Sequence, residues 1–393
     1  MVTSTPSNQA ANASPLESES SAPSTVSLDQ HEVQNSVRQA GINPNFWYAV
    51  AWSNQLAAGQ VLGVEVWQQK IVLYRDRSGA VQAIEDACPH RGVELSRGKV
   101  MGDHLACRYH GWEFDGAGQC RKIPYLPPSQ KLPCAQAKSY RAVDRYGIIW
   151  VFPGDQGLAD QVPLPEIPEF EDPQWLAVPV TGQFRAHFSV CNENSMDVFH
   201  GFLHEELQGW FDPVLLKLKD EGNAIVADYQ VSYKGQMAKF LGFTESADQV
   251  TTKTVTVQYR YPHFFSRLEG VSSLYLMRLP VGLRESRSFA IFFLRLGLPG
   301  WLVQAVRPWA AQLIEQKIFM RFLNQDIEMM ESEQRAIDRD PQRRYVEINP
   351  AIIAVQRMIL RQYQHFLATK PNSQGESALS HKLDRQPKAD QKP

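Results

Sequence analysis

Two short cysteine–histidine motifs constrain this chain more than any other feature of its sequence. Cys88 and His90 form a Cys-x-His pair, and after sixteen intervening residues Cys107 and His110 form a Cys-x-x-His pair. Two thiolates bind one iron ion and two imidazoles bind a second in a [2Fe-2S] centre with mixed ligands. Because each motif supplies one ligand of each kind, two loop tips would have to meet over one cluster. The sequence therefore predicts a [2Fe-2S] site at these four residues.

A structural zinc ion is the alternative for a site of two cysteines and two histidines. Zinc motifs usually pair cysteine with cysteine and histidine with histidine, whereas both motifs here mix the two residue types. The segments CPHRG (88–92) and CRYHGWEFD (107–115) closely resemble the Rieske fingerprint. Val93 and Tyr109 stand where the respiratory type has two further cysteines. The resemblance is therefore to the lower-potential type, which is found in oxygenases and ferredoxins.

A second group of ligand-type side chains, Asp197, His200 and His204, follows further along the chain. The pattern predicts a helix over 193–210, on which these residues, at i, i+3 and i+7, share one face. Such a histidine pair alone would be read as a solvated helix face. With a carboxylate from elsewhere, it makes the facial triad of non-heme Fe(II) oxygenases. The three residues would span about 10 Å of helix axis, so Asp197 is expected beside the iron site rather than bound to the metal.

The carboxylate ligand is predicted to be Asp326, in the late helical segment 318–334. Apolar residues flank it at helical spacing, namely Phe319, Phe322, Leu323, Met329 and Met330. An acid on an apolar stripe would be buried, and a buried carboxylate needs a metal or a cation as its partner. An internal salt bridge is the alternative role for Asp326, and Glu331 and Asp338 are the next candidates for the ligand.

The segment with Asp197, His200 and His204 resembles the motif of aromatic-ring-hydroxylating oxygenase α subunits, the Rieske-type non-heme iron oxygenases. Three residues separate its histidines, where that family usually has four. The Gln325–Asp326 pair is similar to the family's carboxylate position. The segments NFWYAV (45–50) and IPYLPPSQKLP (123–133) look most like the branch that contains pheophorbide a oxygenase, chlorophyllide a oxygenase and vanillate demethylase.

The resemblance implies an enzyme, a mono- or dioxygenase with a [2Fe-2S] cluster and a mononuclear Fe(II). It would use O₂ and electrons from a ferredoxin or an NAD(P)H-dependent reductase. The substrate implied is an aromatic or pigment-like small molecule that is hydroxylated or oxidatively demethylated. A head-to-tail homotrimer is also implied, in which Asp197 links the cluster of one subunit to the iron of the next.

Two other functions are left open by the residues themselves. One is a Rieske electron carrier whose second domain has lost its iron. The other is a ligand-binding protein that uses the same cavity. Iron content separates an oxygenase from a carrier, because an oxygenase would hold about three iron ions per chain and a carrier about two.

The patterning of the chain predicts two domains between two tails. Residues 1–40 and 372–393 are polar and lack hydrophobic periodicity, so both tails are predicted to be disordered. Short strands punctuated by turn residues predict an all-β Rieske domain over 41–155. Longer strands followed by helices predict an α+β helix-grip catalytic domain over 156–371, in which an antiparallel sheet surrounds a helix.

Composition excludes several other classes of protein. A net charge of −2 gives no electrostatic reason to bind nucleic acid. Five cysteines in a long chain, without a signal-peptide pattern, favour the reducing cytoplasm. No uninterrupted apolar run is long enough for a membrane span. The segment 296–306, LGLPGWLVQAV, is expected to begin a buried helix, with peripheral membrane contact as the alternative.

Overall fold

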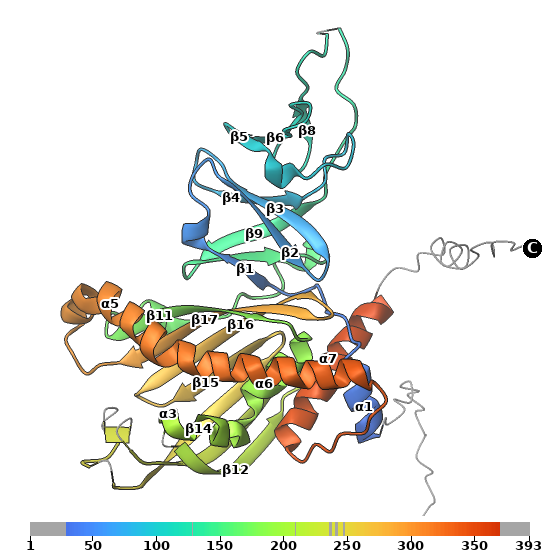
Figure 1. Cartoon of the computed structure of the whole chain (residues 1–393). Coiled ribbons are helices and arrows are strands. Elements are labelled where there is room, and N and C mark those ends of the chain that lie inside the picture. The colour runs from blue at the N-terminus through green and yellow to red at the C-terminus, as the bar shows by residue number, and fades with distance from the viewer. Residues whose placement is uncertain are drawn as a thin grey trace, which may run out of the picture.

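The computed structural model describes residues 29–127, 129–208, 210–235, 238–239, 243–246 and 248–369. Figure 1 shows a smaller β-rich body stacked on a larger body that combines a sheet with helices. The predicted order, an all-β unit followed by an α+β unit, is confirmed. The predicted boundary near residue 155 stays a prediction. β10 ends at Phe152 and β11 begins at Trp175.

The smaller body is built on a six-stranded antiparallel sheet in the order β1-β10-β9-β4-β3-β2. Its strands are β1 (Tyr48–Trp52), β2 (Val61–Val66), β3 (Gln69–Arg75), β4 (Val81–Glu85), β9 (Ser139–Arg145) and β10 (Ile148–Phe152). Every residue of β10 is buried, because one face lies in this body and the other lies toward the larger one. The short helices η1 (Ser53–Gln55), η3 (Gln156–Leu158) and η4 (Pro168–Phe170) accompany the sheet and the linker.

A second, four-stranded sheet forms the tip of the smaller body, far from the larger one (Figure 1). Its strands are β5 (Lys99–Met101), β6 (His104–Ala106), β7 (Glu113–Phe114) and β8 (Cys120–Lys122), with η2 (Leu95–Arg97) beside them. Strands this short stabilise little by themselves. Their buried side chains, among them Leu105 and Phe114, share a small core with Cys88 and Cys107.

The larger body contains a seven-stranded antiparallel sheet in the order β11-β17-β16-β15-β14-β13-β12. The strands are β11 (Trp175–Phe184), β12 (Trp210–Asp220), β13 (Ala224–Tyr233), β14 (Thr251–Arg260), β15 (His263–Leu268), β16 (Ser272–Gly282) and β17 (Glu285–Arg295). The edge strand β12 contains Pro213 and has two irregularities in its register with β13, as is common for proline at a sheet edge. β15 is short, with six residues, and follows Pro262 directly.

Helices cover the sheet of the larger body (Figure 1). They are α2 (Phe188–Met196), η5 (Val198–His204), α3 (Glu205–Gln208), α5 (Gly300–Ile314), η6 (Glu315–Phe319), α6 (Met320–Arg339) and α7 (Pro350–Thr369). α2 packs on α6, α7 and the middle strands, while α5 packs on β11. No helix in the described part of the chain combines the length and apolarity needed to cross a membrane.

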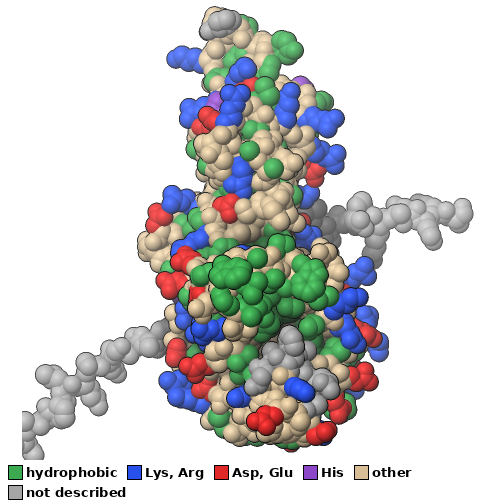
Figure 2. Space-filling view, turned by 90° about the vertical axis from the view of Figure 1, so that its left-hand side faces the viewer, with side chains coloured by type: hydrophobic (Ala, Val, Ile, Leu, Met, Phe, Trp, Pro, Cys, Tyr) green, Lys and Arg blue, Asp and Glu red, His purple; other side chains and the backbone are tan. Residues whose placement is uncertain are grey.

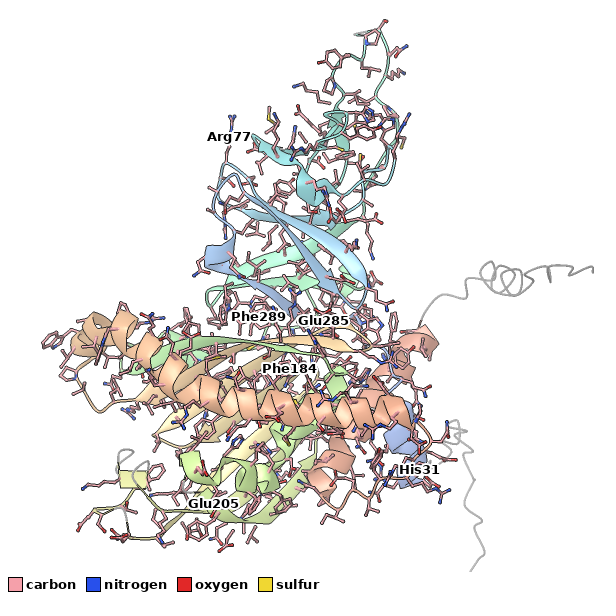
Figure 3. The ribbon with its side chains drawn as sticks, in the orientation of Figure 1. His31, Arg77, Phe184, Glu205, Glu285 and Phe289 are labelled. Atoms are coloured by element: carbon pink, nitrogen blue, oxygen red, sulfur yellow. The ribbon has the colours of Figure 1, made fainter. Side chains whose placement is uncertain are left out.

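The two bodies share one hydrophobic core, which contains residues of both large sheets. Figure 3 labels Phe289 of β17 where the two bodies meet. Its ring packs edge-on against Trp52 of β1, with centroids 5.5 Å apart. The main chain joins them as well, since Trp67 N donates to Pro280 O at 2.8 Å. These contacts fix the orientation of the smaller body on the larger one.

The predicted disorder of residues 1–40 is wrong for their last part. Residues Gln30–Val37 form α1, which begins with a capping box between Asp29 and Glu32. Val33 and Val37 are buried, and the helix packs on α7. The short amphipathic run was hidden by its polar neighbours in the sequence. Residues 1–28 and the predicted tail 372–393 lie outside the described residues.

Candidate metal centres

Two loops of the same design carry the cysteine–histidine pairs. In each loop, a glycine N–H donates to the carbonyl of the cysteine four residues earlier. Gly92 donates to Cys88 at 2.7 Å, and Gly111 donates to Cys107 at 2.9 Å. Both glycines have a φ of 70°, a left-handed conformation that glycine adopts without steric cost. The glycines of the two motifs therefore close two equivalent turns.

These turns bring together the four residues predicted to hold the cluster. The buried thiols of Cys88 and Cys107 are hydrogen-bonded to each other. The rings of His90 and His110 lie 4.7 Å apart between centroids, and Trp112 stacks on His90 at 4.6 Å. The thiols lie inside the tip, whereas His110 is exposed. The histidine side of the site therefore lies at the surface of the tip.

The donor set fits a [2Fe-2S] cluster. His90 Nδ1 is buried and has no hydrogen-bond partner in the part of the chain that is described, as expected of an atom that binds a metal. Burial and the neighbouring Cys107 thiol raise the pKa of Cys88 to about 11, so its ionisation requires a bound cation. Loss of solvent, with the charges of His90 and Arg91, lowers the pKa of His110. This favours the neutral imidazole that binds a metal.

A second group of ligand-type side chains lies in the larger body. His200 and His204 of η5 face Asp326 of α6. Asp326 Oδ1 lies 3.1 Å from His204 Nε2 and 3.7 Å from His200 Nε2, and the ligand atoms of all three lie within 4.8 Å of one another. Two imidazoles and one carboxylate on one side of a metal leave its other positions open for O₂ or substrate. The three residues fit a mononuclear iron, and their assignment as ligands stays a prediction.

The prediction of one continuous helix over 193–210 is wrong. α2 ends at Met196, and Asp197 has an extended backbone, with φ −85° and ψ 96°. Its carboxylate accepts a hydrogen bond from Phe199 N at 3.0 Å and so caps η5, a 3₁₀ helix. This bond competes with continuation of the α-helix. Asp197 is therefore separated from the histidines by the break between two helices, and not by the rise along one continuous helix.

Hydrogen bonds around the three residues orient their side chains. Gln325 Oε1 accepts a hydrogen bond from His204 Nδ1 at 2.8 Å, so that Nε2 faces Asp326. Asn194 Nδ2 donates to Asp326 Oδ1 at 3.5 Å. No role for Gln325 or Asn194 around the iron was predicted. In the sequence, both residues are marked only by their position next to a motif residue. Sequence spacing does not show which side chains of such neighbouring residues point toward the metal site.

The alternative carboxylates on α6 have other partners. Glu331 accepts a hydrogen bond from the backbone N–H of Arg185 at 3.1 Å. Asp338 pairs with Arg284 at 2.8 Å. Asp326 is therefore the acid of α6 that the fold brings to the histidines.

Asp197 lies beside the histidines with its carboxylate held by another element. Asn349 Nδ2, from the start of α7, donates to Asp197 Oδ1 at 3.1 Å. Asn349 is 2% exposed and accepts in turn from Tyr229 OH at 3.2 Å. The main-chain carbonyl of Asp197 accepts a hydrogen bond from the His200 ring. Asp197 thus contacts His200 through its backbone, and its carboxylate is oriented by Asn349.

A cavity of about 360 Å³ extends from the three ligand-type residues into the larger body. Its wall is mainly apolar and includes Val257, Phe264, Leu276, Phe292, Phe319 and Leu323. Phe184, labelled in Figure 3, also lines it, beneath the guanidinium of the buried Arg278. The cavity is therefore polar at the end with the three ligand-type residues and mainly apolar elsewhere, where Ser266 and Ser272 add polar groups.

Comparison with known proteins places these sites in context. Residues 46–141 match the Rieske [2Fe-2S] domain family. The chain is 32% identical over 337 residues to 4beta-methylsterol monooxygenase of Methylococcus capsulatus. This match covers 84% of this chain and 91% of that relative. It is also 33% identical over 205 residues to chlorophyllide a oxygenase of Chlamydomonas reinhardtii. That match covers 49% of this chain and 30% of the relative.

A solved structure has the same fold. The crystal structure of dicamba monooxygenase with non-heme iron and dicamba superposes with a TM-score of 0.64 and 24% sequence identity. The match covers 84% of this chain and 99% of that one. The order of a Rieske domain followed by a sheet-and-helix domain is therefore shared along nearly the whole described chain.

We expect His110→Cys to keep a [2Fe-2S] cluster but to lower its reduction potential, because a thiolate replaces a neutral imidazole. Electron paramagnetic resonance of the reduced protein, with a redox titration, measures both properties. Trp112→Phe retains the ring beside His90 and serves as the control. Stoichiometric zinc in a colourless wild-type protein would reject the cluster.

We expect Asp326→Ala to lose one iron ion per chain and all turnover, while the cluster spectrum remains, because two imidazoles alone bind Fe(II) weakly. Iron analysis with visible spectroscopy separates the two centres. Glu331→Ala, on the same helix, is the matched control and should retain full iron. Retention of iron and activity by Asp326→Ala would instead reject the carboxylate assignment.

Proposed function

Since the chain belongs to the Rieske-type non-heme iron oxygenases, we propose that it is a monooxygenase that oxidises a C–H bond of a large apolar polycyclic molecule. Its cofactors are a [2Fe-2S] cluster and a mononuclear iron, which supply single electrons and O₂ chemistry when bound. Its partners include a redox protein that delivers electrons and a small-molecule substrate. The observation that carries the substrate class is the cavity of about 360 Å³, whose wall is mainly apolar.

The protein's own residues supply positioning and the exclusion of water. Gln325 holds the tautomer of His204, and Asn194 donates toward Asp326. The aromatic side chains of Phe264, Phe292 and Phe319 would hold a hydrocarbon skeleton by contact area, which fixes its position without polar recognition. A C–H bond at one end of the skeleton would then lie next to the polar end of the cavity.

A methylated sterol is the leading substrate class. The relative that matches 84% of this chain is named for a methylsterol, and a sterol is mostly hydrocarbon, as the cavity wall requires. A pigment-like or aromatic substrate is the second candidate, since the partial match to chlorophyllide a oxygenase includes 49% of the chain. Both would undergo hydroxylation or oxidative demethylation.

The two other functions, an electron carrier and a ligand-binding protein, leave the ligand-type residues of the larger body without a role. A carrier needs no second metal site, yet His200, His204 and Asp326 lie together in the larger body. His204 and Asp326 are 122 residues apart in sequence. We propose that a ferredoxin with a flavin reductase is the electron donor.

We propose the cytoplasm as the place of the reaction.

Substrate-dependent O₂ consumption tests the proposal. We expect holoenzyme with ferredoxin, reductase and NAD(P)H to consume O₂ and to yield a hydroxylated product with a methylated sterol. Aromatic methoxy acids and porphyrin-type pigments are assayed alongside it. His200→Ala controls for uncoupled O₂ reduction. Uptake only with the aromatic acids or the pigments would reject the sterol class, and no uptake with any substrate would reject the oxygenase activity.

We propose that copies of the chain assemble head to tail into a trimer. Phe202, Val346 and Ile348 are exposed by 86%, 88% and 83%. They lie close in sequence to the hydrogen-bonded pair Asp197 and Asn349. The cluster tip, with Tyr109 exposed by 58%, offers an apolar surface of its own. Contact between the two surfaces is heterologous, and a heterologous contact gives a closed ring when its rotation closes, here after three copies.

We expect Ile348→Asp to give monomers in analytical ultracentrifugation, because the contact would bury an unpaired charge. Iron content per chain should be unchanged, and turnover should be lost. Leu367→Asp places the same charge on α7, at a residue 47% exposed, and should leave the trimer intact. A monomeric wild-type protein with full activity would contradict the assembly.

Asp197 would connect the two metal centres across this contact by accepting a hydrogen bond from a cluster histidine of the neighbouring copy. We expect Asp197→Asn to keep both metals but to slow reoxidation of the reduced cluster by about tenfold or more, as when a carboxylate partner of a histidine is lost. Stopped-flow absorbance with substrate and O₂ measures this rate. Glu205→Gln, on the neighbouring α3, is the control. A wild-type rate in Asp197→Asn, or loss of its mononuclear iron, would rule out the bridging role.

A further inference from the structure

Helix α5 carries large apolar side chains on both of its sides. Its inner side packs on β11, where Val303 is buried with Leu176 and Val178. Its outer side carries Trp301 and Trp309, which are 74% and 69% exposed. The two tryptophans are eight residues apart and so lie on one helix face. The exposed Gln304 and Gln312 stand on the same helix, and large apolar side chains beside polar ones on an exposed face are typical of a helix at an interface.

The exposed tryptophans belong to a wider apolar surface. Leu298 and Leu313, exposed by 40% and 44%, extend it before and along the helix. We call Leu298, Trp301, Trp309 and Leu313 the α5 face. Figure 2 shows hydrophobic side chains gathered on the side of the larger body that carries α5. Apolar patches of this kind mark contact with a protein or a membrane.

The charges in the sequence of α5 and its flanks are mostly positive, while two exposed acids, Glu171 and Asp172, precede Pro173, whose carbonyl accepts a hydrogen bond from Gln304. Between residues 295 and 321 there are four basic residues and one acid, Glu315. The basic residues are Arg295, Arg307, Lys317 and Arg321. Tryptophan at the centre with arginine and lysine at the edges is the composition of a surface that lies in the headgroup region of an anionic bilayer. The positive charge of these residues thus favours binding to an anionic phospholipid surface over binding to a protein surface with few acidic residues.

The α5 face is continuous with the wall of the cavity. Ile314, the last residue of α5, lines the cavity, and Ile318 and Phe319 follow it in η6. The same stretch of chain is therefore exposed at one end and encloses the cavity at the other. An apolar substrate dissolved in lipid would reach the cavity along this stretch without crossing water.

We propose that the α5 face docks the protein on the surface of a bilayer that contains anionic phospholipids, with α5 lying in the plane of the headgroups. Docking would deliver the substrate to the cavity from the lipid phase. This second statement rests on the proposed function, because it requires an apolar substrate. The expected segment 296–306 is thus a helix start whose inner side is buried and whose outer side is available to lipid.

Co-sedimentation of the holoprotein with lipid vesicles tests the docking. We expect binding to vesicles of phosphatidylcholine with phosphatidylglycerol, and weaker binding to phosphatidylcholine alone or at high salt. The double variant Trp301→Ser/Trp309→Ser should bind about tenfold more weakly, because it removes the two largest apolar contacts. Leu283→Ser/Leu367→Ser removes two exposed leucines outside the α5 face and should bind as the wild type does. Circular dichroism and iron content confirm that each variant is folded.

Wild-type protein that stays in the supernatant with both kinds of vesicle would overturn the proposal, as would undiminished binding by the tryptophan variant. Loss of self-association by that variant, without vesicle binding by the wild type, would show that the α5 face joins copies of the chain instead. The measurement uses no substrate and no electron donor. Vesicle binding without O₂ uptake would therefore reject only the proposed activity, and O₂ uptake without vesicle binding would reject only the docking.

Discussion

The meeting of two imidazoles from η5 with one carboxylate from α6 is the constraint on which the larger body depends. His204 and Asp326 are 122 residues apart in sequence and 3.1 Å apart in space. Three ligand-type groups this close are stable together only with a shared cation or proton between them. The seven-stranded sheet holds the metal site by supporting α2 below η5 and by carrying α6 across its surface. The apolar cavity is the space that remains between these elements and the sheet.

The second constraint is the fixed separation of the two centres within one chain. Figure 1 shows the cluster tip at the far end of the smaller body from α6. The shared core between the bodies, with Trp52 packed on Phe289, opposes any folding of the tip toward the iron site. The exposed side of the cluster site is its histidine side. Electrons would therefore leave this tip toward another molecule, which is the physical reason for the proposed trimer.

The fold could be predicted largely from the sequence, apart from segments without a clear pattern. The expected order of an all-β unit and an α+β unit is observed, and the late helical segment 318–334 lies in η6 and α6. α1 was missed because its stabilisation comes from α7 and from the pair between Arg38 and Glu193. An unpaired Glu193 at this buried position would cost several kcal/mol, about 3–5 by comparison with other buried pairs. No local pattern of eight residues carries that information.

The sequence by itself determined the cluster loops, because their geometry is local. A turn closed over four residues, with glycine at its end, depends on residue type and spacing alone. The tertiary structure decided how the iron site is built. It broke the expected helix at Asp197, brought Asp326 to the histidines while Glu331 and Asp338 found other partners, and turned Gln325 toward His204. These outcomes depend on the angle at which α6 crosses the sheet, which is set by packing between segments far apart in the chain.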